Sequence, residues 1–277
     1  MNSQEQIETV NPAESELKSQ FHLFAKRRFL PFFVTQFLGA LNDNLFKNAL
    51  LVLVVSTAIA GSGENTNFTT NFAVGLFILP FFLFSTTAGQ LADTYDKAWL
   101  MRRVKITEIF IMLAGSYALL TLNLNFMLII LFLLGTQSAF FGPLKYSILP
   151  QHVAPHELTK ANGLVESGTF VAILLGTVFG TYYITQAAGP VYISIAIVSL
   201  AVIGYLSSRF IPKSAANDAN LKVSLNPISS TNSVFNALNA QTESVGKSVL
   251  GISWFWLIGA VILTALPNYV KHVMGGD

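Results

Sequence analysis

The sequence has no cysteine and few charged residues. Only 11% of its 277 residues are Asp, Glu, Lys or Arg, whereas about 25% is typical of soluble domains. The absence of cysteine excludes a disulfide framework, a cysteine-based metal site and a cysteine nucleophile. The shortage of charge leaves too little polar surface for a water-soluble protein. Hydrophobic residues make up 52% of the chain, and the 23 phenylalanines suit helices whose solvent is hydrocarbon.

Other absences exclude further classes of function. The net charge of +2 gives no basis for a nucleic-acid partner, and the first residues are acidic and lack the apolar core of a signal peptide. Only His152 and His156 are four residues apart, with Pro155 between them, so we predict no metal site and no cofactor. No phosphate-binding loop, dinucleotide-binding glycine pattern or nucleophile elbow is present, so we do not expect an enzyme.

Apolar runs long enough to cross a bilayer predict seven transmembrane helices. The runs are 29–60, 72–91, 104–122, 126–141, 164–186, 191–210 and 249–270. If the N terminus is cytoplasmic, every Lys and Arg except Lys47 and Lys271 falls on the inner side. The loops 61–71, 123–125 and 187–190 carry no basic residue, as expected of external loops. The pattern predicts a multi-pass membrane protein with a cytoplasmic N terminus.

A polar stretch rich in Ser, Asn and Ala separates the sixth run from the seventh. We therefore expect a cytoplasmic tail at 1–28, a six-helix transmembrane half at 29–210, a cytoplasmic linker at 211–247 and a seventh transmembrane helix at 248–277. This order is that of the major facilitator architecture, in which two six-helix halves are joined. The predicted fold class is all-α, a polytopic helical membrane protein with the six-helix N-terminal half of a major facilitator fold plus a seventh helix. Since such a fold needs five more spans, we expect an N-terminal fragment.

The first predicted span contains the polar sequence QFLGALNDNLFKN. At 100° per residue, Gln36, Asp43 and Lys47 fall on one helical face. Charges inside a bilayer cost at least ~2.5 kcal/mol each on insertion scales and usually face a cavity or a partner. Asp43 and Lys47, four residues apart, are expected to neutralise each other in part. The face is a candidate substrate-binding surface, and a structural contact between helices is the alternative.

The segment GQLADTYDK, which follows the second span, resembles the loop signature between helices two and three of the major facilitator superfamily. Gly89 and Asp93 match that signature, but a Thr replaces the usual basic residue. The resemblance implies a gating loop braced by charge pairing, with Arg102 and Arg103 as its basic residues. A helix cap followed by a turn would also explain a Gly and an Asp at this position.

The fifth predicted span carries Gly168, Gly176 and Gly180, and the last two are four residues apart. Such spacing predicts that another helix packs closely against this face. Among the remaining charges near the inner surface, Glu108 and Lys145 are expected to be solvated or to extend towards the interface. For Glu166 we leave a solvated and a functional position open.

Three segments together resemble the bacterial lysophospholipid transporters of the major facilitator superfamily. They are QFLGALNDNLFKNAL at 36–50, FFGPLKYSILPQH at 140–152 and KANGLVESGTFVAILLGT at 160–177. In particular the chain is similar to the transporter portion of fused proteins that also contain a phospholipid acyltransferase and an acyl carrier protein synthetase. The resemblance implies movement of lysophospholipid, chiefly lysophosphatidylethanolamine, from the outer to the inner leaflet of the inner membrane for reacylation.

The same resemblance places the polar residues of the family's first helix on Asp43 and Asn44, its helix-four loop lysine on Lys145 and its helix-five glutamate on Glu166. In this interpretation Asp43 holds an ammonium, and Lys47 or Lys145 holds a phosphate. The expected partners are the bilayer, the lysophospholipid and an acyltransferase that is either separate or fused. The predicted substrate-binding set is Gln36, Asp43, Asn44, Lys47, Lys145 and Glu166.

Two alternatives stay open at this stage. One is an ion-coupled facilitator for another small solute, with Asp43 or Glu166 as the coupling carboxylate. The other is a membrane anchor for an acyltransferase that moves nothing. Competition by lysophospholipid but not by sugars distinguishes a lipid carrier from the first, and any measured flux excludes the second.

Overall fold

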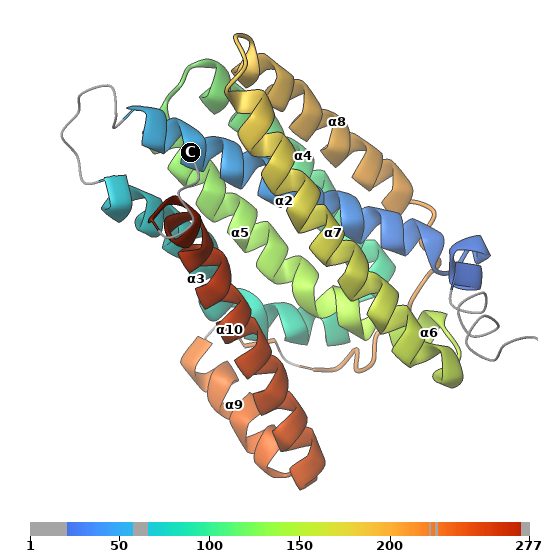
Figure 1. The fold of residues 1–277 in the computed structure, drawn as a ribbon. Coiled ribbons are helices and arrows are strands. Elements are labelled where there is room, and N and C mark those ends of the chain that lie inside the picture. Colours follow the sequence, from blue (N-terminus) through green and yellow to red (C-terminus); the bar gives the residue numbers. More distant parts are fainter. Residues whose placement is uncertain (1–20, 58–65, 222, 225–226, 273–277) are drawn as a thin grey trace, which may run out of the picture. The chain divides into compact units, whose positions relative to one another are not determined.

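The computed structural model describes residues 21–57, 66–221, 223–224 and 227–272, and all regular structure in these ranges is helical (Figure 1). This confirms the predicted all-α fold class. Most of the predicted tail 1–28 and residues 61–65 of the predicted external loop 61–71 lie outside the described residues, and the rest of that loop belongs to the first turns of α3. The helices are η1 (His22–Ala25), α2 (Leu30–Thr57), α3 (Thr66–Thr94), α4 (Lys97–Leu120), α5 (Leu124–Ser147), α6 (Leu149–His152), η3 (Pro155–Glu157), α7 (Leu158–Ile184), α8 (Gly189–Ser208), α9 (Pro227–Asn239) and α10 (Glu243–His272).

Five of the described helices are long and apolar enough to cross a membrane. These spans are Leu30–Ser56, Thr69–Thr94, Leu124–Ser147, Pro155–Ile184 and Gly189–Ser208. The third predicted span, 104–122, lies on α4, which is of similar length but carries several charges in its first half. The seventh, 249–270, lies within α10.

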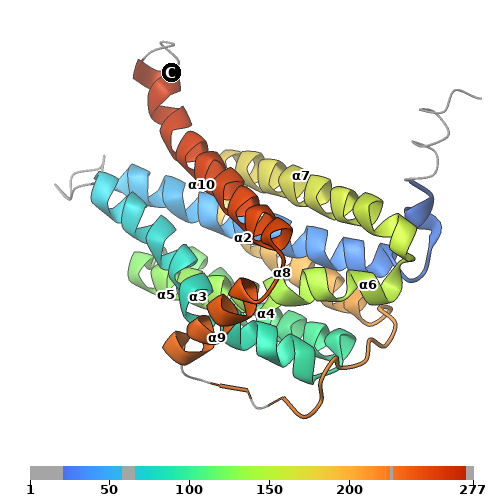
Figure 2. The ribbon, with the colours of Figure 1, turned by 90° about the horizontal axis from the view of Figure 1, so that it is seen from below.

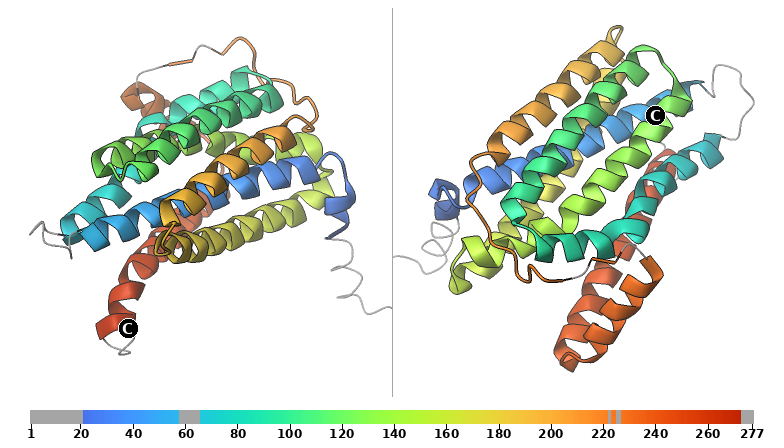
Figure 3. Two further views of the ribbon diagram at one scale, coloured as in Figure 1. Left: turned by 90° about the horizontal axis from the view of Figure 1, so that it is seen from above. Right: turned by 180° about the vertical axis from the view of Figure 1, so that it is seen from behind.

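The chain forms two compact units, residues 1–223 and residues 224–277. In the first unit six long helices run back and forth, and α2 lies in the middle, in contact with α7, α8 and α5 (Figures 1 and 2). On the other side α4 lies between α8 and α5, and α3 packs against α5 (Figure 3). In the second unit α9 and α10 contact each other.

Polar caps fix two of the short turns between these helices. The Asp96 side chain accepts a hydrogen bond of 2.7 Å from the Trp99 N–H and so begins α4 directly after α3. The Asn123 side chain accepts a hydrogen bond of 3.0 Å from the Phe126 N–H at the start of α5. Each cap satisfies a backbone donor that the first turn of a helix leaves free.

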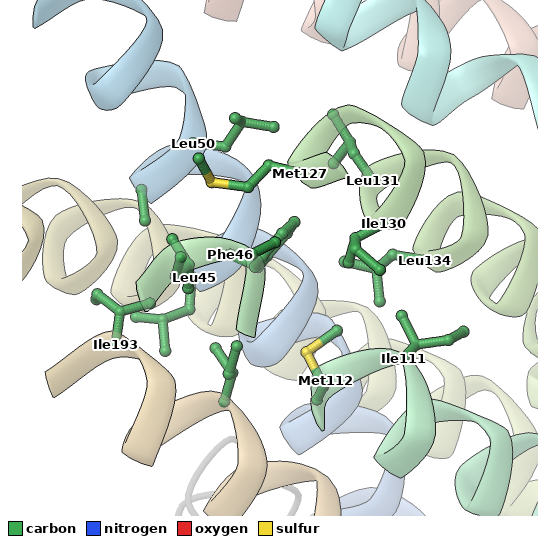
Figure 4. Close-up of a cluster of buried hydrophobic side chains, with 14 of the residues drawn as sticks. Leu45, Phe46, Leu50, Ile111, Met112, Met127, Ile130, Leu131, Leu134 and Ile193 are labelled. Atoms are coloured by element: carbon green, nitrogen blue, oxygen red, sulfur yellow. The ribbon is translucent and has the colours of Figure 1, made fainter. Parts of the chain in front are cut away.

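Two clusters of buried apolar side chains hold the first unit together. One surrounds Phe46 of α2 and includes Met112 of α4 and Ile130 of α5 (Figure 4). The other surrounds Phe29 at the start of α2 and Met101 of α4. Large apolar side chains also cover the outside of the unit. This surface matches hydrocarbon, so the helices are held together mainly by close packing and polar contacts.

Gly176 and Gly180 of α7 lie against α2, which confirms the predicted close approach. A Cβ atom on Gly176 would lie 2.7 Å from the Leu41 carbonyl oxygen, and one on Gly180 would lie 2.6 Å from the Leu45 carbonyl oxygen. Because glycine has no Cβ, the two backbones approach closely at these positions. This contact fixes α7 against the polar residues of α2.

Candidate functional site

A polar cavity of about 180 Å³ lies between α2, α3, α4, α5 and α7 of the first unit. Both signs of charge line it, although the surrounding helices are mostly apolar. Charged groups in such a setting usually face a cavity or a partner, because burying them in lipid is costly. The polar and charged lining consists of Gln36, Asp43, Lys105, Gln137, Ser138, Lys145 and Thr169.

Asp43 has one bonded and one unbonded carboxylate oxygen. Its Oδ2 accepts a hydrogen bond of 2.5 Å from the Ser138 hydroxyl, whereas its Oδ1 is buried and has no hydrogen-bond partner among the described residues. Asp43 and Lys47 interact electrostatically, as expected, but form no direct ion pair within the described residues. The Lys47 amino group instead donates to Asn44 Oδ1 at 2.8 Å and lies 5.3 Å from the centre of the Phe77 ring. The Lys47 amino group lies towards Phe77 of α3 and does not occupy the free oxygen of Asp43.

A buried ion pair on α4 joins three helices. The Lys105 amino group lies 2.5 Å from Glu108 Oε2, and both side chains are almost fully buried. Glu108 also accepts hydrogen bonds from Asn42 of α2 at 3.0 Å and from Gln137 of α5 at 3.1 Å. The expected solvated position of Glu108 is therefore wrong, because neighbouring helices supply donors that replace water.

Lys145 is also buried, which contradicts its expected position at the interface. Its amino group donates to Thr169 Oγ1 at 2.8 Å and lies 3.1 Å from Glu166 Oε1. Glu166 accepts a further hydrogen bond of 2.6 Å from the Tyr146 hydroxyl. Thr169 in turn donates to Gln36 Oε1 at 3.1 Å, so these contacts connect α5, α7 and α2.

The structure brings together only part of the predicted substrate-binding set. Gln36, Asp43 and Lys145 line the cavity, and Glu166 adjoins it through Lys145. Asn44 and Lys47 do not line it. Asn44 packs instead against Gly176 of α7.

Sequence reasoning missed Lys105, Gln137, Ser138 and Thr169 as lining residues. Lys105 was assigned to the inner membrane surface because it lies at the very start of the third apolar run, whereas α4 already begins at Lys97 and carries Lys105 two turns into the helix. The spacing of Lys105 and Glu108, three residues apart on one helix, was the available signal. Nothing in the sequence distinguishes Gln137 and Ser138 from other polar residues in apolar spans.

The predicted gating loop contacts the segment that follows α8. We call residues 211–218 the connector strap. The Asp93 side chain accepts a hydrogen bond of 2.7 Å from the Asn217 amide, and its carbonyl accepts one of 2.8 Å from the Asn217 N–H. Asp96 Oδ2 accepts a hydrogen bond of 2.9 Å from the Ser214 N–H. The predicted linker thus begins with an anchored segment, and it also contains α9.

Basic residues of α4 complete this anchor. The Lys97 amino group is buried and donates to Asn217 Oδ1 at 3.1 Å. Arg102 donates to the Ile211 carbonyl oxygen at 2.9 Å. Arg103 instead lies over the Trp99 ring at 5.1 Å. Among the predicted gating residues, Asp93 and Arg102 therefore contact the strap, whereas a Cβ atom on Gly89 would meet no atom within 4 Å.

Comparison with known proteins gives one family. The family model described as Major Facilitator Superfamily matches residues 32–277. The chain is similar to the lysophospholipid transporter LplT of Escherichia coli O7:K1 (strain IAI39 / ExPEC), with 31% identity over 245 residues, which cover 87% of this chain and 57% of the relative. It is similar to the same transporter from Escherichia coli (strain SE11), with 31% identity over 249 residues and the same coverage. The chain therefore spans a little over half the length of these curated relatives.

Proposed function

Because this chain belongs to the Major Facilitator Superfamily, we propose that its polar cavity binds the headgroup of a lysophospholipid, chiefly lysophosphatidylethanolamine, while that lipid crosses the bacterial inner membrane. Relatives named lysophospholipid transporters support this substrate class. The product on the inner leaflet is then reacylated, and an acyltransferase, separate or fused, is the proposed partner. The N terminus lies in the cytoplasm in this proposal, because positive charge concentrates on the inner side.

The observation that carries the proposal is the charge pattern of the cavity. A phosphoethanolamine headgroup has an ammonium and a phosphate, and the lining offers both an acid and bases. The unbonded Oδ1 of Asp43 is a ready acceptor for the ammonium. A buried carboxylate oxygen without a partner is unfavourable, so a ligand that donates to it gains a charge-assisted hydrogen bond.

The size of the cavity fits a headgroup better than a whole lipid. Its volume of about 180 Å³ is smaller than the ≈ 300–1,000 Å³ typical of sites for drug-sized ligands. The acyl chain would therefore stay outside, against apolar side chains that face the hydrocarbon. This division keeps the charged end of the substrate away from lipid tails during the crossing.

Binding to the purified chain in nanodiscs tests the proposal. We expect lysophosphatidylethanolamine to bind, sugars not to compete, and Asp43→Asn to weaken binding because the amide keeps the size but loses the charge. Glu243→Gln is the matched control, since Glu243 is an exposed acid paired with Lys247 on α10.

Uptake of the lipid into spheroplasts, with protein abundance measured in parallel, extends the test to flux. Wild-type affinity of folded Asp43→Asn would contradict the headgroup site. Uptake of sugars rather than lipid would favour a small-solute facilitator.

A further inference from the structure

We propose that Lys105 is the phosphate-binding residue of the cavity, and that Gly39 and Gly204 form the slot through which its side chain reaches it. The inference rests on the proposed function, because it assigns the phosphate of the same lysophospholipid to one lysine. It differs from the expectation drawn from sequence, which placed the phosphate on Lys47 or Lys145.

The slot is defined by two glycines on different helices. A Cβ atom on Gly39 of α2 would lie 3.2 Å from the Lys105 amino nitrogen. A Cβ atom on Gly204 of α8 would lie 2.9 Å from Lys105 Cε and 3.0 Å from its nitrogen. The lysine therefore occupies the space that two ordinary side chains would fill. Lys105 belongs to α4, but it lines the cavity, and its amino group lies beside Gly39 of α2.

The Lys105 ammonium has N–H groups that are not used in hydrogen bonds to the described residues. An ammonium carries three N–H groups, and Glu108 is its one hydrogen-bond acceptor within the described ranges. The centre of the Phe141 ring, which also lines the cavity, lies 6.0 Å from the nitrogen. Phosphate oxygens are strong acceptors for such N–H groups.

Lys105 can bind a ligand while Glu108 stays hydrogen-bonded, because two other side chains donate to Glu108. Its Oε1 accepts from Asn42 and its Oε2 accepts from Gln137. These two hydrogen bonds persist when the ammonium turns partly towards a phosphate. The carboxylate thus pairs with Lys105 in the absence of substrate and is not left unbonded in its presence.

The other two lysines are less suited to this role. Lys47 does not line the cavity. Lys145 does, but it is held by both Thr169 and Glu166. Glu166 has fewer other donors than Glu108, since the Tyr146 hydroxyl is its one further hydrogen-bond donor in the part of the chain that the structure describes. Turning Lys145 away would therefore cost more than turning Lys105.

The test compares lysophosphatidylethanolamine with a monoacylglycerol of the same acyl chain, which lacks both the phosphate and the ammonium, on the chain in nanodiscs. Lys105→Met alone leaves Glu108 as an unpaired buried charge and is expected to lower the folded yield. The double variant Lys105→Met/Glu108→Gln removes both charges and preserves the acceptor for Gln137 or Asn42. We expect it to fold, to bind monoacylglycerol as the wild type does, and to bind the lysophospholipid about tenfold or more weakly.

Single variants separate the two partners. Glu108→Gln keeps Lys105 but leaves it as an unpaired buried charge, so a lower folded yield is expected here too; the folded protein should keep the preference for the phosphate-containing lipid. Gly204→Ala should weaken that preference by displacing the ammonium, whereas Gly163→Ala, where an added Cβ meets nothing within 4 Å, should not.

Retained preference in the folded double variant would overturn the role of Lys105 and leave the proposed function standing. Equal loss of preference in Glu108→Gln would also overturn it, because the pair and not the lysine would then be responsible. Absence of any preference in the wild type would instead refute the proposed headgroup site.

Discussion

Replacing Gly176 by alanine is expected to force α7 away from α2 and to destabilise the first unit. The added Cβ would lie 2.7 Å from both the Leu41 carbonyl oxygen and the Asn44 Cβ, where ordinary contacts begin at 3.4 Å. The helices must therefore separate by about 0.7 Å, the difference between these distances. Overpacking of this kind typically costs about 1–3 kcal/mol.

Gly163→Ala provides a control within the same helix. Gly163 is exposed, and a Cβ added there meets no atom within 4 Å. Alanine is favoured over glycine in a helix interior by about 1 kcal/mol, and this gain applies to both variants. The difference between the two variants therefore measures the packing cost alone.

Thermal unfolding followed by circular dichroism in detergent measures this difference. For a unit of this size, each 1 kcal/mol corresponds to roughly 2–4 °C in the melting temperature. We expect Gly176→Ala to melt below Gly163→Ala by several degrees. If Gly176→Ala melts at or above the control, the close contact between α2 and α7 does not limit stability, and the argument from the glycine face is refuted.

Three further predictions address orientation, pH and the N-terminal segment. A cysteine at Asn125 should be labelled only from the periplasm and one at Ala219 only from the cytoplasm; the reverse pattern would invert the proposed topology. Burial lowers the pKa of His152 from its ordinary 6.5, so as the pH falls through about 6.5 the unfolded chain gains a proton that the folded chain does not, and stability should fall. The melting temperature should decrease between about pH 7.5 and pH 5.5 in the wild type and in His156→Leu but less in His152→Leu; an equal decrease in all three would contradict this. Glu157→Gln removes the carboxylate that pairs with the N-terminal segment, so limited proteolysis should cleave that segment faster, with a cost of about 0.5–1 kcal/mol; an unchanged cleavage rate would show that the pairing is not needed.

The helical fold was predictable because the bilayer imposes one dominant constraint. Apolar runs and the positions of basic residues both follow from the cost of placing charge in hydrocarbon. The glycine face of α7 was predictable for a similar reason, since small residues four apart are the usual way for helices to approach in lipid. These signals are local in the sequence and do not depend on the identity of the neighbouring helix.

The cavity was only partly predictable because its residues depend on tertiary partners. Lys105 and Glu108 can be buried only when Asn42 and Gln137 of other helices supply hydrogen bonds. Hydropathy alone assigns such charges to the membrane surface. Spacing predicted that Asp43 and Lys47 would interact, but it could not predict that the Lys47 amino group donates to Asn44 and makes no direct contact with the carboxylate.

The connector strap shortens the part of the chain that connects the first unit to the second. Because Asp93 and Asp96 hold Ser214 and Asn217, the tether to the second unit starts near residue 218 and not at the end of α8. About ten residues after α8 are thereby held against the first unit. If they were extended, they would lengthen the tether by about 33–36 Å. Extra residues inserted after 218 would lengthen the tether at a small entropic cost, about 0.6 kcal/mol for each doubling of its length. The same residues inserted within 211–218 would instead disturb the helix bundle itself.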